Sequence, residues 1–119
     1  MELSVVVPVY NEEESLEPFV KEVLGVVTHI GKNFEVIIVD DGSTDRTYPI
    51  LSDLHERDPR IKILRLKRNF GQTAALAAGI DYSKGDVIVL MDGDGQNDPK
   101  DIPALLDKIE DGFDLVCGW

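Results

Sequence analysis

Cysteine, histidine and long hydrophobic runs are nearly absent from this chain of 119 residues. The single cysteine, Cys117, excludes an internal disulfide and fits a reducing compartment. The two histidines have no partners at ligand spacing, and no Ser-His-Asp, Cys-His or zinc pattern occurs. The longest apolar stretches are strand-sized, and neither a signal peptide nor a membrane span is recognisable, so the sequence predicts no entry into a bilayer.

Basic residues are scarce as well. The chain has 12 Lys and Arg against 23 Asp and Glu, a net charge of -11. This balance argues against a nucleic-acid partner, because a basic face is the usual footprint of such proteins. An anionic ligand would need local compensation from a metal ion, helix N-termini or a few placed cations. No G-x-G-x-x-G motif follows the first predicted strand, so a dinucleotide site of the usual kind is unsupported.

The remaining composition, 43% apolar and 29% charged, is typical of one globular domain over residues 1–119. Apolar runs predict five strands, over Leu3–Val7, Phe34–Val39, Ile61–Leu66, Asp86–Met91 and Asp114–Cys117. Helical spacing predicts four helices between them: one carrying Leu16 to Val27 and ended by the break at Gly31–Asn33, one after Ser43 that ends at Asp58–Pro59, an Ala-rich one over Gly71–Ser83, and one from Pro99. Strands joined by helices imply parallel crossovers, so we expect an α/β fold, a mostly parallel sheet with helices on both faces.

Two local details are also predicted. Pro8 should close the first strand, because proline cannot donate to a central ladder. Glu12, Glu13 and Glu14 should lie in the first turn of the following helix, where the helix dipole favours acidic side chains.

Polar clusters follow each of the first four predicted strands. In parallel α/β sheets, ligands bind beyond the carboxyl ends of the strands, and these ends meet at one edge. We therefore expect a shared ligand site formed by four segments, Pro8–Glu12, Asp40–Ser43, Arg68–Gly71 and Asp92–Gln96.

The last of these segments has the donor set of a metal site. Asp92 and Asp94 lie on the same side of an extended segment, and Gln96 adds a neutral oxygen. Such oxygens suit Mg²⁺ or Mn²⁺. A calcium loop of the EF-hand type is excluded, because its sixth and twelfth positions would hold Asn97 and Pro103. A phospho-receiver domain also fits poorly, since the acidic pair follows the second strand instead of the first.

The other clusters leave alternatives open. Tyr10 offers a flat face for stacking on a base or sugar, or is a half-buried packing residue. Glu12 can contact a ligand or simply be favoured by the helix dipole. Asp40 and Asp41 point to opposite sides of a strand, so at most one faces the ligand directly and the other can cap the loop. Lys67 and Arg68 can approach a diphosphate or belong to a solvated strand end.

Three segments in this order resemble family 2 glycosyltransferases, and most closely the polyprenyl- and dolichyl-phosphate sugar transferases: Ser4–Glu12, Val39–Asp45 and Asp92–Gln96. The resemblance implies the GT-A type of fold, a Rossmann-like nucleotide-diphospho-sugar transferase fold. It implies that residues 1–119 are the N-terminal, nucleotide-sugar-binding part of a glycosyltransferase domain, truncated after the fifth strand. Gly93 and Gly95 stand where many relatives carry Ala and Leu, which weakens any assignment to a subgroup.

The resemblance also implies roles for individual residues. The base and ribose of the donor would contact Pro8, Tyr10, Glu12, Val39 and Asp41. The rest of the nucleotide sugar would contact Asp92, Gly93 and Asp94, and a Mg²⁺ or Mn²⁺ ion would be bound by Asp92, Asp94 and Gln96.

The implied function is a metal-dependent, inverting transfer of a sugar from a donor of the GDP-mannose or UDP-glucose type. The acceptor would be a polyprenyl phosphate or a glycan, and the protein would be cytoplasmic, at the cytoplasmic face of the membrane. The catalytic base and any membrane-associating segment would lie beyond Trp119, so we expect this chain alone to transfer no sugar at a useful rate. The alternative is a nucleotide-binding or interaction module that lacks transfer activity.

Overall fold

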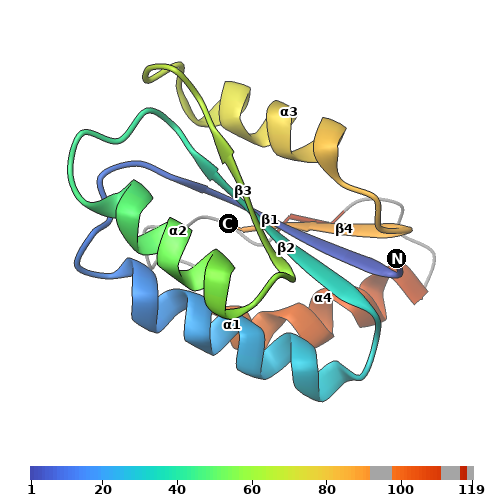
Figure 1. Cartoon of the computed structure of the whole chain (residues 1–119). Coiled ribbons are helices and arrows are strands. Elements are labelled where there is room, and N and C mark those ends of the chain that lie inside the picture. The colour runs from blue at the N-terminus through green and yellow to red at the C-terminus, as the bar shows by residue number, and fades with distance from the viewer. Residues whose placement is uncertain (92–97, 111–115, 118–119) are drawn as a thin grey trace.

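The computed structural model describes residues 1–91, 98–110 and 116–117 (Figure 1). Its five strands form one sheet in the order β3-β2-β1-β4-β5, and every pairing is parallel. The strands are β1 (Leu3–Val9), β2 (Phe34–Asp40), β3 (Ile61–Arg65), β4 (Val87–Leu90) and β5 (Val116–Cys117). The helices are α1 (Leu16–Ile30), α2 (Thr47–Arg57), α3 (Gln72–Tyr82), the short 3₁₀ turn η1 (Pro99–Asp101) and α4 (Ile102–Glu110). The predicted α/β fold is thus confirmed.

Helices cover the two faces of the sheet unequally. In Figure 1, α1, α2 and α4 lie on one side of the sheet and α3 lies alone on the other. Each face has its own apolar core: Val5 and Ile38 pack on the three-helix side, whereas Val6 and Ile37 pack with Ala75 of α3. All residues of β1 and β2 are buried, as expected for central parallel strands covered on both faces.

The helix α3 lies unusually close to the sheet. A Cβ atom added at Gly79 would overlap Val6 and lie 3.1 Å from Val39 Cγ2. A glycine at this position therefore sets the distance between α3 and the two central strands. This close approach agrees with the prediction that a thin, Ala-rich helix packs on the sheet.

Pro8 does not end the first strand, contrary to the prediction. It lies inside β1 and is paired with Val39 of β2. The carbonyl of Val9 accepts a hydrogen bond from Asp41 on the β2 side, and that of Val6 accepts one from Met91 on the β4 side. Because successive residues of a parallel strand face alternate neighbours, the missing N–H of Pro8 faces the β4 side, beyond the end of β4. Continuing the register of Val6 with Leu90 would place the Met91 carbonyl opposite this position, so the ladder between β1 and β4 ends at the proline while the pairing of β1 with β2 continues.

The start of α1 also differs from the prediction. The helix begins at Leu16, so Glu17 is the acidic residue of its first turn, and Glu12 to Glu14 precede the helix in a turn. The main-chain N–H of Leu16 donates to the carbonyl of Glu12 at 3.0 Å, which extends this turn into the helix. The helix ends as predicted, with Gly31 in the left-handed conformation at φ 82°.

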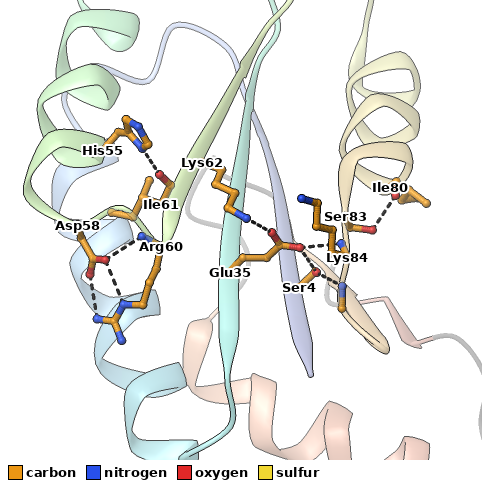
Figure 2. A network of polar contacts seen from close by, with 11 residues as sticks. Ser4, Glu35, His55, Asp58, Arg60, Ile61, Lys62, Ile80, Ser83 and Lys84 are labelled. Carbon is orange, nitrogen blue, oxygen red and sulfur yellow. Dashed lines mark hydrogen bonds and ion pairs between the residues drawn. The ribbon is translucent and has the colours of Figure 1, made fainter. Parts of the chain in front are cut away.

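A buried polar cluster ties the strands together at the amino edge of the sheet (Figure 2). Glu35 is fully buried, and its carboxylate accepts hydrogen bonds from the Ser4 hydroxyl at 2.6 Å, Lys62 Nζ at 2.7 Å and the Lys84 main-chain N–H at 2.7 Å. The Ser4 hydroxyl accepts in turn from the N–H of Gly85 at 2.8 Å. This cluster joins β1, β2, β3 and the segment before β4 at the edge opposite the predicted ligand site.

No helix among the residues that the structure describes is long and apolar enough to cross a membrane.

Candidate functional site

Three of the four predicted polar segments meet at the carboxyl edge of the sheet. The loops after β1, β2 and β3 lie on the same side of the molecule in Figure 1. They enclose a pocket of about 230 Å³, which is lined by Pro8, Val9, Tyr10, Glu12, Asp41, Asn69, Gly71 and Gln72. The fourth segment, Asp92–Gln96, lies outside the described residues.

Asp41 connects the end of β2 to the loop between β3 and α3. Its two carboxylate oxygens accept hydrogen bonds from the main-chain N–H groups of Phe70 at 2.8 Å and Gly71 at 3.0 Å. Asp41 is 4% exposed, yet it lines the pocket. A carboxylate oxygen has two lone pairs, so each oxygen retains capacity to accept a further hydrogen bond from a ligand.

Asp40 has the other role that the sequence left open. It is fully buried, and its Oδ1 accepts a hydrogen bond at 2.9 Å from the main-chain N–H of Ser43, three residues on, which closes the loop after β2. Its Oδ2 has no hydrogen-bond partner among the described residues. Asp40 does not line the pocket, so the adjacent pair divides into a loop-capping carboxylate and a pocket-lining one.

The loop after β1 is fastened to the loop after β2. Asn11 has a positive φ of 50°, its main-chain N–H donates to the Ser43 hydroxyl at 2.9 Å, and its side-chain oxygen accepts from the Thr44 N–H at 2.8 Å. The N–H of Glu12 donates to the Thr47 hydroxyl at 2.9 Å. These bonds position Tyr10 and Glu12, on either side of Asn11, at the pocket.

Asp45 holds the start of α2 in this arrangement. Its carboxylate accepts hydrogen bonds from the Thr47 N–H at 2.9 Å and the Thr47 hydroxyl at 2.5 Å. Burial alone would raise the pKa of Asp45, but these bonds and one from the Glu13 N–H outweigh burial and lower its pKa. Asp45 therefore stays ionised and caps the helix that follows the site.

Gly42 lets the loops after β2 and β3 touch. Its φ is 73°, and an added Cβ would lie 2.7 Å from the Arg68 Cα atom. Any side chain at this position would push the loop of Arg68 to Gly71 away from Asp41, and the pocket wall would move with it.

Of the five residues predicted to contact the base and ribose of the donor, the structure brings four together at the pocket. Pro8, Tyr10, Glu12 and Asp41 come together at the pocket, and Tyr10 is 42% exposed. Val39 does not line the pocket: it lies two residues before Asp41 on the same face of the sheet, where α3 covers it beside Gly79 and buries it fully.

The predicted metal ligands Asp92, Asp94 and Gln96, and Gly93 between the carboxylates, fall among the residues that the structure leaves undescribed. Met91 just before them is described. Its N–H donates to the Val6 carbonyl at 2.9 Å, so Met91 lies next to β1, the strand that contains Pro8 and precedes Tyr10. In the described ranges, no group of three or more His, Cys, Asp or Glu side chains is arranged to hold a metal ion.

Sequence reasoning missed part of the pocket. It did not single out Asn69 or Gln72, although the strand-end rule placed the segment Arg68–Gly71 at the site. It also missed Asn11. The available signal was an asparagine just after a strand end, between Tyr10 and Glu12, because asparagine adopts positive φ more readily than most residues. These residues shape the loops around the pocket.

A parallel α/β sheet with a pocket beyond the carboxyl ends of its strands is the architecture of ligand-binding α/β proteins. An aromatic face and a carboxylate in that pocket can bind a base and a sugar hydroxyl. The family model for "Glycosyl transferase family 2" matches residues 4–119, and the chain belongs to this family.

Similar curated proteins transfer sugars to polyprenyl phosphates, according to their names. The chain is 47% identical, over its whole length, to a dodecaprenyl-phosphate galacturonate synthase of Rhizobium johnstonii, of which it covers 36%. It is 41% identical to an undecaprenyl-phosphate 4-deoxy-4-formamido-L-arabinose transferase of Edwardsiella ictaluri, with 96% of this chain and 35% of that protein aligned. The chain thus spans about a third of the length of these relatives.

Solved glycosyltransferase structures share the fold. TarS of S. aureus in complex with UDP matches with a TM-score of 0.67 and 28% identity, over 91% of this chain and 32% of that one. A mannosyltransferase of Pyrobaculum calidifontis, solved with GDP-Man and Mn²⁺, matches with a TM-score of 0.69 and 24% identity, over 87% of this chain and 30% of that one. The GT-A fold expected from the sequence is therefore confirmed.

Proposed function

We propose that this chain binds a nucleoside-diphosphate sugar in the pocket at the carboxyl edge of the sheet. In the protein that carries it, this pocket would serve transfer of the sugar to a polyprenyl phosphate. The observation that carries the proposal is the meeting of Tyr10 and Asp41 in one pocket of a family 2 glycosyltransferase.

The pocket suits the base and ribose of the donor. Tyr10 offers an exposed aromatic face, and base–aromatic stacking contributes roughly 1–3 kcal/mol. Asp41 can accept a hydrogen bond from a base N–H or a ribose hydroxyl while its two loop bonds persist. The volume of about 230 Å³ lies below the roughly 300–1,000 Å³ of sites for whole small molecules, which fits a pocket for one end of the donor. The relative TarS, solved with UDP, supports a nucleoside-diphosphate ligand.

We assign the diphosphate end to the segment after β4. Two carboxylates and an amide form a donor set that fits Mg²⁺ or Mn²⁺, and Asp92, Asp94 and Gln96 would hold the ion. The position of Met91 supports this assignment. Met91 immediately precedes Asp92 in sequence, and its N–H donates to Val6 of β1, the strand that contains Pro8. A bound divalent ion would neutralise the diphosphate in a chain whose net charge is -11.

The acceptor is inferred from the relatives. Both the R. johnstonii and the E. ictaluri proteins are named for transfer to a polyprenyl phosphate. Such an acceptor lies in a bilayer, so transfer would take place at a membrane surface. The sugar differs between these two relatives, and we leave it open.

Thermal unfolding with a panel of ligands tests the donor. UDP, GDP, UDP-glucose and GDP-mannose are each added with Mn²⁺ or with EDTA, and ADP serves as the control nucleotide. We expect the ligands of one base, either uridine or guanosine, to raise the unfolding temperature with Mn²⁺ and to raise it much less in EDTA. No shift with any nucleoside diphosphate would contradict the proposal. Radiolabelled sugar transfer from the preferred donor to polyprenyl phosphate then tests the reaction.

A further inference from the structure

Exposed cations follow one another at the carboxyl end of β3. Arg65, Lys67 and Arg68 are exposed, and Phe70, which follows them, is 51% exposed. In Figure 1 this segment forms the loop between β3 and α3, on the same side of the molecule as the other loops of the candidate site. We call these four residues the basic rim.

The cations of the basic rim have no carboxylate partner in the part of the chain that the structure describes. Arg65 stacks on the ring of Tyr48 at 4.0 Å, and Arg68 stacks on Phe70 at 4.7 Å. Elsewhere in the described chain, five cations form ion pairs with carboxylates: Lys21, Lys32, Arg57, Arg60 and Lys62. Three exposed cations without an ion pair thus lie within four residues of one another, on a protein of net charge -11.

A hollow lies beside these cations. It has a volume of about 450 Å³, between the loop after β2 and the end of β3, and is lined by Gly42, Ser43, Thr44, Arg65, Leu66 and Lys67. A guanidinium, an ammonium and two hydroxyls can all donate hydrogen bonds to phosphate oxygens, and the two charged donors form the stronger ones. The hollow shares no lining residue with the pocket that we assign to the donor.

Phe70 adds an apolar element to the same rim. An exposed aromatic ring beneath a guanidinium has an apolar body and a charged head, the combination that favours the boundary between water and lipid. A site for a small free anion would gain nothing from an exposed phenylalanine next to it.

We propose that the basic rim docks on a membrane surface that contains anionic lipids. Lipid phosphates enter the hollow beside Arg65 and Lys67, and Phe70 enters the headgroup region. The charge complementarity is local: at physiological salt, charges farther away than about 8 Å are screened, so the acidic remainder of the chain repels the membrane only weakly.

This docking would have a consequence for the donor pocket, which opens at the same edge. If the proposed function holds, docking by the basic rim brings bound donor to the surface that contains the lipid acceptor. The docking itself does not rest on the proposed function, because it needs only the cations, the hollow and the aromatic ring.

Co-sedimentation with lipid vesicles tests the inference. The chain is mixed with vesicles of phosphatidylcholine alone or with added phosphatidylglycerol, at low and high salt. We expect binding only to the anionic vesicles, weakened by salt. Because each cation near such a surface contributes about fivefold in affinity, Arg65→Gln with Lys67→Gln should lower the partition coefficient about 25-fold. Phe70→Ser should lower it further.

The matched control removes the same charge elsewhere. Lys21→Gln with Arg57→Gln takes two exposed cations from α1 and α2 and should leave vesicle binding nearly unchanged. Thermal unfolding checks that each variant is folded, and Lys67→Gln alone, which loses no described contact, replaces the double variant if that one is unstable. Nucleoside-diphosphate binding by Arg65→Gln with Lys67→Gln should stay normal, because neither residue lines the donor pocket, so failure of docking and failure of donor binding are separate results.

The proposal is overturned by equal binding to neutral vesicles, by no binding to anionic vesicles at low salt, or by an equal loss in the control variant. Binding of single-stranded RNA that depends on Arg65 and Lys67 and exceeds binding to vesicles would assign the rim to nucleic acid instead.

Discussion

The Asp41 carboxylate accepts a hydrogen bond from the main-chain N–H of Gly71 at 3.0 Å. This bond crosses from the end of β2 to the start of α3, between residues 30 positions apart in sequence. Together with the bond from Phe70, it holds the loop between β3 and α3 against Asp41 at the candidate donor pocket. The same carboxylate that would meet the ligand therefore also shapes the pocket.

Asp41→Asn should weaken nucleotide binding and also destabilise the fold. An asparagine has one acceptor oxygen, so its NH₂ group would face one of the two N–H donors, at a cost of about 1–3 kcal/mol. Calorimetry with the nucleotide that the panel selects and urea unfolding measure the two effects.

Asp40→Asn is the matched control for this change. It keeps one oxygen for the Ser43 N–H and removes a buried charge whose Oδ2 lacks a partner among described residues. We expect nucleotide affinity to change much less than in Asp41→Asn. A damaging Asp40→Asn with a silent Asp41→Asn would show that the two roles are reversed.

Tyr10→Ala should weaken nucleotide binding without weakening the fold. Loss of one stacking partner costs about 1–3 kcal/mol, or roughly 5- to 150-fold in affinity. Tyr10 is 42% exposed, so its removal leaves little cavity. Tyr82→Ala, which changes a tyrosine of 45% exposure at the far end of α3, is the control and should bind nucleotide normally. Equal affinities of all three proteins would remove Tyr10 from the site.

Gly79→Ala should destabilise the protein although alanine favours helices. The added Cβ would overlap Val6, and such overpacking costs about 1–3 kcal/mol, more than the roughly 1 kcal/mol gained in helix propensity.

Gly25→Ala is the opposite case and serves as the control. Gly25 lies inside α1 with nothing within 4 Å of an added Cβ, so the change should stabilise by about 0.5–1 kcal/mol. Urea unfolding of both variants measures the difference, and a Gly79→Ala protein as stable as Gly25→Ala would contradict the close packing of α3.

Glu35 should make stability depend on pH in the acid range. Burial raises its pKa, but hydrogen bonds from Lys62, Ser4 and Lys84 outweigh burial, so its pKa lies below the ordinary 4.5. A group whose pKa is lowered on folding stabilises the fold above its unfolded pKa, and this stabilisation is lost as the pH falls through the folded value. The loss from Glu35 therefore occurs below pH 4.5.

Glu35→Gln should cost about 2 kcal/mol near neutral pH, because its NH₂ group would face Lys62 Nζ in place of a carboxylate oxygen. The variant should also lose less stability than the wild type when urea unfolding is repeated at about pH 3. Glu17→Gln, which removes an exposed carboxylate paired with Lys21, should change neutral stability far less. If the free energy of unfolding falls equally with pH in Glu35→Gln and in the wild type, the buried cluster is not the source of the acid-range dependence.

The strand–helix alternation made most of the fold predictable from sequence. Continuous apolar runs marked the buried parallel strands, and Gly31 marked the end of α1. The strand-end rule then placed Pro8, Tyr10, Glu12 and Asp41 at one edge, where the structure has its pocket. Local signals sufficed here because each depends on neighbouring residues only.

The features that sequence reasoning did not place depend on partners distant in sequence. Pro8 continues β1 because it still pairs with Val39 of β2, and Val39 is covered by α3 because it lies two residues before Asp41 on the same face. The contact of Ser4 with Glu35 was not predicted, because only the pairing of β1 with β2 brings the Ser4 hydroxyl to 2.6 Å from the Glu35 carboxylate.

The most direct test of the central claim is calorimetric titration of the 119-residue chain with UDP and GDP, in Mn²⁺ and in EDTA. We predict that one of them binds with Mn²⁺, that EDTA weakens this binding strongly, and that Asp94→Asn weakens it by more than about 100-fold, above the 10- to 100-fold typical of outer-shell changes. Equal affinity in Mn²⁺ and EDTA would contradict the metal assignment, and no binding of either nucleotide would contradict the donor site itself.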